Sequence, residues 1–163
     1  MAAGKNGFDS KRNNMCCVAE VSLSYSRKIE NSELPQISIS NEVYEIFYNS
    51  WDHNTIALQE SFRVMLLNRA NRVLGILTAS IGGIAGTVVD PKIVFTAALK
   101  ASATGIILCH NHPSGNTRPS SSDISATRKL KAAGDVLEIE VLDHIIINEE
   151  QGMYYSFADN NMI

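Results

Sequence analysis

The stretch GIILCH, residues 105–110, constrains the fold more than any other part of the chain. It is short and almost wholly apolar, which is typical of a strand that is buried on both faces of its sheet. Each apolar face of such a sheet has to be covered by another layer of structure. We therefore expect an α/β protein whose sheet lies between two layers of helices.

Apolar periodicity predicts the remaining elements. Alternating or continuous apolar runs predict strands at residues 18–25, 62–67, 73–80, 139–147 and 154–157. Helical spacing predicts a helix at 43–51 capped by Ser40 or Asn41, a second from Asp90-Pro91 to about Ser102, and a third from near Asp123 to a stop at Gly134. Strands that alternate with helices in this order indicate a three-layer α/β/α sandwich with a mixed sheet.

The length of 163 residues fits one domain with one core. Residues 1–15 are rich in Gly, Asn, Lys and Ser, so we expect a disordered tail followed by a single domain over residues 16–163. No apolar run approaches the roughly 20 residues of a membrane span, and the N-terminus lacks the apolar segment of a secretory signal. We expect a cytoplasmic protein in which Cys109 is a small buried hydrophobe.

The formal net charge of -3 argues against a surface built to hold nucleic-acid phosphates, since such a surface needs clustered Lys and Arg. A local basic patch is still compatible with this charge, so nucleic acid stays open as a partner. The basic residues near the N-terminus, Lys5, Lys11 and Arg12, are interpreted as part of the solvated tail.

The segment HNHPSGNTRPSSSD, residues 110–123, is the most informative for function. His110 and His112 lie two apart at the end of the buried strand, and this spacing in an extended chain points both imidazoles to one side, within reach of one ion. The loop then delivers Asp123 as a third ligand at the head of a helix. Two histidines and one carboxylate suit a catalytic Zn²⁺ that keeps a fourth position for water. Ser120 and Asp123 also have the spacing of a helix capping box, which explains neither histidine.

The residues His110, His112, Pro113, Ser120 and Asp123 match the H-x-H-P-x6-S-x2-D signature of JAB/JAMM metalloproteases, and the fuller string HNHPSG resembles the RadC family in particular. The segments ESFRVMLL, GTVVDPKIVF and VLDHIII extend the resemblance over about two thirds of the chain. The resemblance implies the JAB/JAMM fold, which is similar to that of cytidine deaminases, and one zinc ion per chain. It also implies hydrolysis of a peptide or isopeptide bond in a protein or peptide substrate.

The same resemblance implies roles for two further residues. Glu60 matches the JAMM glutamate that activates the zinc-bound water, and alternation places it on the same side of its strand as Phe62. Ser120 resembles the serine that donates a hydrogen bond to the oxyanion, a contact worth about 3 kcal/mol. His144 matches a family position that has no role to transfer; a satisfied core histidine and support of the site from outside the ligand shell are both compatible with it.

The chain departs from longer RadC proteins in two ways. No helix-hairpin-helix region is recognisable ahead of residue 43, so the resemblance does not imply DNA binding, and Lys92 stands where many members have arginine. A zinc deaminase is excluded because HxE and PCxxC motifs are missing, and a two-His-one-carboxylate iron oxygenase differs in sequence order. Three functions stay open: a zinc-dependent peptidase or isopeptidase, which the complete ligand set favours; an accessory protein associated with DNA repair or a mobile element, with a metal site but no peptidase role; and a non-catalytic scaffold.

Overall fold

A computed structural model describes residues 30–83 and 86–163 of the chain. The elements in this part are the 3-10 helix η1 (Asn31–Glu33), α1 (Ser40–Ser50), β1 (Ser61–Leu67), β2 (Val73–Ile81), α2 (Pro91–Lys100), β3 (Gly105–Asn111), α3 (Ser121–Leu137), β4 (Glu140–Ile147) and β5 (Tyr154–Ser156). The predicted tail at residues 1–15 and the predicted strand at 18–25 lie outside the described residues, so the predicted domain bounds stay a prediction.

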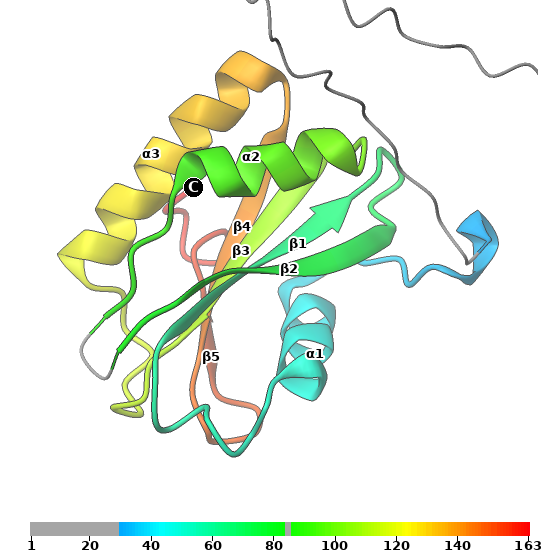
Figure 1. The fold of residues 1–163 in the computed structure, drawn as a ribbon. Coiled ribbons are helices and arrows are strands. Elements are labelled where there is room, and N and C mark those ends of the chain that lie inside the picture. Colours follow the sequence, from blue (N-terminus) through cyan, green and yellow to red (C-terminus); the bar gives the residue numbers. More distant parts are fainter. Residues whose placement is uncertain (1–29, 84–85) are drawn as a thin grey trace, which may run out of the picture.

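The described strands form one mixed sheet with the order β2-β1-β3-β4-β5 (Figure 1). β3 and β4 run parallel, and the other three neighbouring pairs are antiparallel. The helix α1 covers one face of the sheet, and α2 and α3 cover the other (Figure 1). The prediction of a three-layer α/β sandwich with a mixed sheet is therefore confirmed.

The side chains of the central strands alternate between the two faces, and each face has its own core. Met65 and Ile107 pack with Phe47 of α1 on one side. Val64 and Leu108 pack with the apolar residues of α2 and α3 on the other side. β3 is buried at every position, as predicted for a strand with helices on both faces. Cys109, in this strand, is fully buried, which agrees with its interpretation as a small hydrophobe.

The N-terminus of α1 differs from the prediction. The helix begins at Ser40, so neither Ser40 nor Asn41 is its cap, and Ile39 occupies the N-cap position. Glu42, in the first turn, holds the entry to the helix, because its Oε2 accepts the N–H groups of Ser38 at 2.6 Å and Ile39 at 3.3 Å. The predicted cap was wrong because the helix begins earlier than predicted, at Ser40, and the N-cap residue Ile39 has no side-chain acceptor for the N–H groups of the first turn.

The helices α2 and α3 begin close to the positions that the sequence predicts. Asp90 caps α2 as predicted, with its Oδ1 accepting the Lys92 N–H at 2.9 Å. α3 runs past the predicted stop at Gly134 to Leu137. Gly134 has a different role, because a Cβ at this position would overlap the carbonyl oxygen of Ile139, where the chain turns back toward β4. No helix of the described part is both long and apolar enough to cross a membrane.

A bulge in β4 determines which of its side chains face α3. Ile106 of β3 pairs with Val141 and Ile107 pairs with Asp143, so Leu142 is an extra residue in β4. Leu142 consequently packs against the α1 core, whereas the ring of His144 lies on the α3 side. Simple alternation in the sequence predicts that Leu142 and His144 lie on the same face of the sheet. This prediction is wrong, because the bulge puts them on opposite faces.

Candidate metal centre

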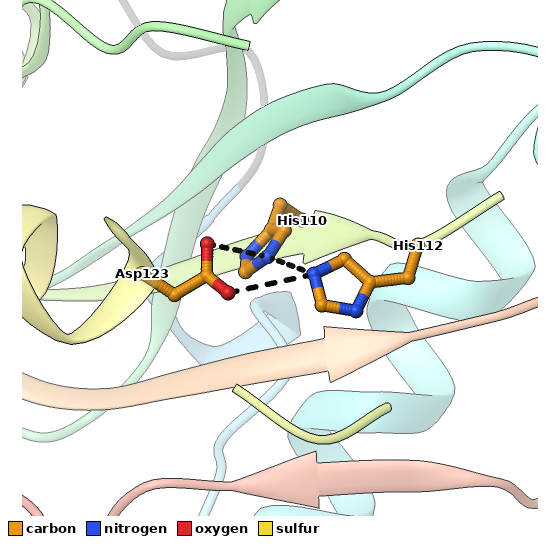
Figure 2. Close-up of side chains that lie close together, drawn as sticks. All are labelled: His110, His112 and Asp123. Atoms are coloured by element: carbon orange, nitrogen blue, oxygen red, sulfur yellow. Dashed lines mark hydrogen bonds and ion pairs between the residues drawn. The ribbon is translucent and has the colours of Figure 1, made fainter. Parts of the chain in front are cut away.

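The three predicted ligands meet at the end of β3, where it faces the N-terminus of α3 (Figure 2). His110 Nε2 lies 2.9 Å from His112 Nε2 and 3.3 Å from Asp123 Oδ1. His112 Nε2 lies 3.5 Å from Asp123 Oδ2. Each residue offers one ligand atom, and these atoms lie within 4.8 Å of one another. The three side chains therefore converge on a single point.

The spacing and chemistry of these atoms fit a zinc ion. Zinc bonds of 2.0–2.1 Å to nitrogen and oxygen place the ligand atoms of a tetrahedral site about 3.3 Å apart, which is close to the separations found here. His112 Nδ1 lies 2.6 Å from the carbonyl oxygen of Asn116. Since a carbonyl oxygen only accepts, Nδ1 carries the hydrogen and the neutral ring turns a bare Nε2 toward the centre. His112 thus has the tautomer that a metal ligand requires.

The cap of α3 holds the carboxylate of Asp123 in place. Asp123 Oδ2 accepts the Ser120 N–H at 2.7 Å, and Ser120 Oγ accepts the Asp123 N–H at 3.2 Å. The capping box suggested by the sequence is thus present, and it leaves Oδ1 directed at His110. Capping and ligation therefore use the same carboxylate without competing for it.

The electrostatics of the site favour a cation. Burial disfavours the charged form of Asp123, but the contacts with His110 and His112 outweigh burial and hold the pKa of this carboxyl far below its usual range. The contact with Asp123 in turn raises the pKa of the His112 imidazole. A proton and a metal ion compete for the same ring nitrogen of His112, and the carboxylate attracts both.

Glu60 stands beside this centre without belonging to the cluster of three. Phe62 pairs with His110 in the antiparallel β1 and β3, and Glu60 precedes Phe62 by two residues, so Glu60 lies near the level of His112 at the end of the sheet. Glu60 lines a hollow of about 430 Å³ with Phe62, His110 and Asp123, and it lines an adjoining hollow with His112. Glu60 and Phe62 therefore border the same hollow beside the candidate ligands, and the catalytic role of Glu60 stays a prediction.

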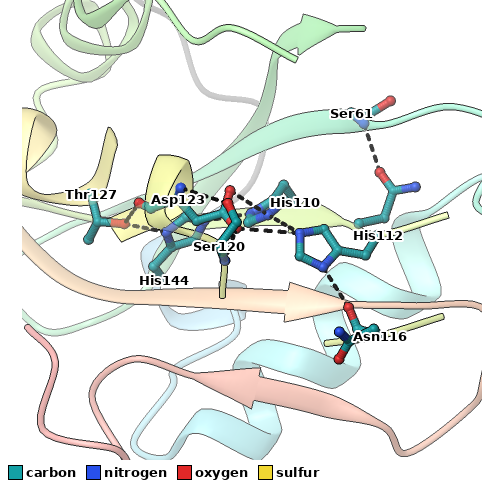
Figure 3. A network of polar contacts seen from close by, with 9 residues as sticks. Ser61, His110, His112, Asn116, Ser120, Asp123, Thr127 and His144 are labelled. Carbon is teal, nitrogen blue, oxygen red and sulfur yellow. Dashed lines mark hydrogen bonds and ion pairs between the residues drawn. The ribbon is translucent and has the colours of Figure 1, made fainter. Parts of the chain in front are cut away.

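His144 is both a core residue and a neighbour of the site. Its side chain is fully buried, and burial lowers the pKa of its imidazole well below the usual value. Its Nε2 lies 2.8 Å from His110 Nδ1, and its Nδ1 lies 2.6 Å from Thr127 Oγ1 (Figure 3). His144 is therefore a core histidine whose ring nitrogens both have partners, and its contact with His110 keeps the second interpretation, support of the site, open. Thr127, one of these partners, was not identified from the sequence.

Asn111, between the two histidines, is a second residue that the sequence did not single out. Its side chain points away from theirs and is fully buried. Its Oδ1 accepts the Ser61 N–H at 2.7 Å, and its Nδ2 donates to the carbonyl oxygens of Ile56 at 2.6 Å and Gln59 at 2.9 Å. Asn111 therefore fixes the segment that presents Glu60. A polar residue at the end of a buried strand is the only local signal of this role.

Replacing Asn111 with aspartate is expected to lower the free energy of unfolding by about 2–4 kcal/mol, because two buried carbonyls lose their donor and face a carboxylate instead. Urea denaturation of the wild type and the variant measures the change. Asn116→Asp is the matched control, since Asn116 is exposed and its Oδ1 only accepts a hydrogen bond, and its effect should stay within about 0.5 kcal/mol. Equal stability of Asn111→Asp and the wild type would contradict this account.

The fold and the site together define an α/β domain with a candidate metal centre at one end of a mixed sheet. Residues 37–162 match the family described as the RadC-like JAB domain, and the chain belongs to this family.

Several curated proteins named UPF0758 protein are similar to the chain. The one from Flavobacterium johnsoniae is 50% identical over 103 residues, which cover 63% of this chain and 44% of the relative. The one from Geotalea uraniireducens is 40% identical over 139 residues, 85% of this chain and 58% of the relative. The one from Clostridioides difficile is 34% identical over 158 residues, 91% of this chain and 66% of the relative. The chain thus spans about half the length of the curated relatives it matches, and their names specify neither an activity nor a substrate.

Proposed function

We propose that the chain is a zinc-dependent hydrolase that cleaves a peptide or isopeptide bond with a metal-activated water. One observation carries the proposal: two ring nitrogens and one carboxylate converge within 3.5 Å while a second carboxylate, that of Glu60, stands beside them outside the cluster. His110, His112 and Asp123 would hold the ion. A zinc ion bound there supplies Lewis acidity, which lowers the pKa of a water toward about 7 and polarises a carbonyl.

Glu60 provides the proton-accepting group. Glu60 lines both hollows beside the ligand cluster, which would place its carboxylate near a water and a substrate bound there. As a general base it takes a proton from the attacking water, and as a general acid it returns this proton to the leaving amine nitrogen. These two transfers are what amide hydrolysis requires of a side chain that does not bind the metal.

Ser120 provides a donor to the substrate carbonyl. Its oxygen accepts the Asp123 N–H in the cap, so its hydroxyl proton is not used there. The side chain is exposed and lines the same hollow as Glu60 and His112. A hydrogen bond from this hydroxyl would stabilise the negative charge that develops on the carbonyl oxygen during attack.

Two adjoining hollows suit an extended peptide that crosses the ligand cluster. Glu60, Thr87, Ser122 and Asp123 form the wall that the hollows share. The hollow on the His110 side has apolar lining from Phe62, Val89 and Leu130, so it favours an apolar side chain of the substrate. The hollow on the His112 side is polar and contains Arg118, so it favours an acidic or polar side chain.

The test is cleavage of a random peptide library and a matched series of Lys-linked isopeptides by the purified chain, with new termini identified by mass spectrometry. Cleavage should stop when zinc is removed by a chelator and return when zinc is restored. The cleaved sequences should favour an apolar residue on one side of the scissile bond. A chain that holds zinc and cleaves no member of either series would favour the accessory function instead.

A further inference from the structure

The second ring nitrogen of His110 has an unusual partner. A metal-binding histidine commonly donates its other N–H to a carboxylate, a backbone carbonyl or a water. His110 Nδ1 instead lies 2.8 Å from another imidazole, at Nε2 of His144. His144 Nδ1 contacts Thr127 Oγ1 at 2.6 Å, and this hydroxyl donates to the carbonyl oxygen of Asp123 at 2.6 Å (Figure 3). The chain of contacts therefore begins at one candidate ligand and ends on the backbone of another.

The positions of the hydrogens in this series of contacts follow from its last acceptor, the carbonyl oxygen of Asp123. The carbonyl oxygen of Asp123 only accepts, so the single hydroxyl proton of Thr127 is directed to it. The Thr127 oxygen then offers His144 only a lone pair, and the hydrogen between them has to be on His144 Nδ1. A neutral imidazole has one N–H, so His144 Nε2 is bare and accepts from His110 Nδ1. His110 Nε2 is consequently bare as well, and it faces the ligand cluster.

The opposite direction leaves the contact between Thr127 and the Asp123 carbonyl without a hydrogen. If Thr127 donated to His144, its oxygen would lie 2.6 Å from the Asp123 carbonyl oxygen with no hydrogen between them. His144 would then donate to His110, and the hydrogen of His110 would lie on Nε2. There it could bond to His112 or Asp123, but it would occupy the lone pair with which His110 binds a metal ion. The fold thus favours the direction in which His110 serves as a metal ligand.

The surroundings of His144 support a neutral ring in a fixed orientation. The ring lies between Phe62 and Phe157, with centroid separations of 5.5 Å and 4.8 Å. Among the described residues, its nitrogens bond only to His110 and Thr127, and no carboxylate contacts them. A charged imidazole buried in this way would lack a counter-ion. The contacts with His110 and Thr127 determine the orientation of this neutral ring and which of its nitrogens carries the hydrogen.

We propose that Thr127 and His144 are positioning residues that set the tautomer and ring orientation of His110 and thereby strengthen metal binding. Helix α3 supplies Asp123 and, one turn later on the same face, Thr127, so one helix positions the carboxylate directly and the imidazole through His144. The inference rests on the metal binding in the proposed function, but not on hydrolysis.

The test compares Thr127→Val, which removes the hydroxyl at nearly constant shape, with Thr127→Ser, which keeps it. Chelator competition measures the zinc dissociation constant, and ¹H–¹⁵N spectra of the imidazoles locate the hydrogens of His144. The wild type should carry its His144 hydrogen on Nδ1. The dissociation constant should rise about 10- to 100-fold in Thr127→Val and stay near the wild-type value in Thr127→Ser. Thr96→Val, at an exposed position of α2, is the matched control and should bind zinc as the wild type does.

Several outcomes would overturn the inference. A hydrogen on His144 Nε2 in the wild type would reverse the direction of the hydrogen bonds from His110 to Thr127. This measurement uses the wild type alone, so it does not depend on the stability of any variant. Unchanged zinc affinity in Thr127→Val, or equal weakening in Thr127→Val and Thr127→Ser, would show that the hydroxyl plays no part. A wild type that binds no zinc would overturn both this inference and the proposed function, whereas one that binds zinc and cleaves no peptide would overturn the proposed hydrolase alone.

Discussion

The His112→Ala variant is expected to purify with almost no zinc, whereas the wild type should carry about one zinc per chain. Removal of His112 leaves a single ring nitrogen, that of His110, and the carboxylate of Asp123, and two protein ligands do not retain zinc through purification. Elemental analysis of both proteins measures the difference. Because the His112 side chain is only partly buried and its hydrogen bond outside the cluster is to the Asn116 carbonyl, the variant should keep its fold.

His53→Ala is the matched control for this experiment. His53 is exposed, and its ring contacts Tyr48 of α1, with centroids 4.6 Å apart, rather than the ligand cluster. This variant should keep about one zinc per chain. Stoichiometric zinc in His112→Ala would mean that His110, His112 and Asp123 do not form the zinc site, and the proposed hydrolase would then have no metal centre.

Local patterns in the sequence were sufficient to predict the layers and most elements of the described part. The apolar run of β3 indicates a strand covered on both faces, and the structure buries all of it. Asp90 with Pro91 predicts the start of α2 because this pair satisfies the first free N–H group of a helix and fixes its first dihedral angle. These signals depend on neighbours in sequence, so they can be interpreted without the tertiary structure.

The ligand cluster was predictable for a similar reason. The two-residue spacing of His110 and His112 places both rings on one side of an extended chain, and the capping box places Asp123 in the first turn of the next helix. The parallel pairing of β3 with β4, with α3 as the crossover between them, brings the end of β3 to the start of α3. Motif spacing therefore defined the cluster before any contact was known.

The supporting contacts could not be predicted, because they join residues that are far apart in sequence. Asn111 holds a segment some 50 residues earlier, and the pairing of His144 with His110 depends on a bulge at Leu142 that no local pattern reveals. The start of α1 was missed for a different reason. The contacts of Glu42 with the N–H groups of Ser38 and Ile39 are local, but several polar residues near a helix start can fix it, and sequence alone does not decide among them.

Glu60→Gln is expected to lower kcat for peptide cleavage by about 10²- to 10⁴-fold while zinc binding stays unchanged. Glutamine has nearly the same shape, and the backbone of residue 60 keeps its hydrogen bonds to Gly82 and Gly83, so the change removes the basic carboxylate and little else. Rates on a peptide identified from the library, together with zinc analysis of the same samples, measure the effect. Glu150→Gln, at an exposed position that belongs neither to the ligand cluster nor to the lining of the two hollows, should leave both quantities unaltered.

The paired readout separates the roles that a carboxylate beside a metal can have. Loss of zinc together with activity in Glu60→Gln would make Glu60 a fourth ligand, which would close the position that a reacting water needs. An undiminished kcat with zinc retained would remove Glu60 from the proton transfers and leave the hydrolase without an identified base. Only a loss of kcat at constant zinc content agrees with the position of Glu60, next to His112 and outside the cluster of three.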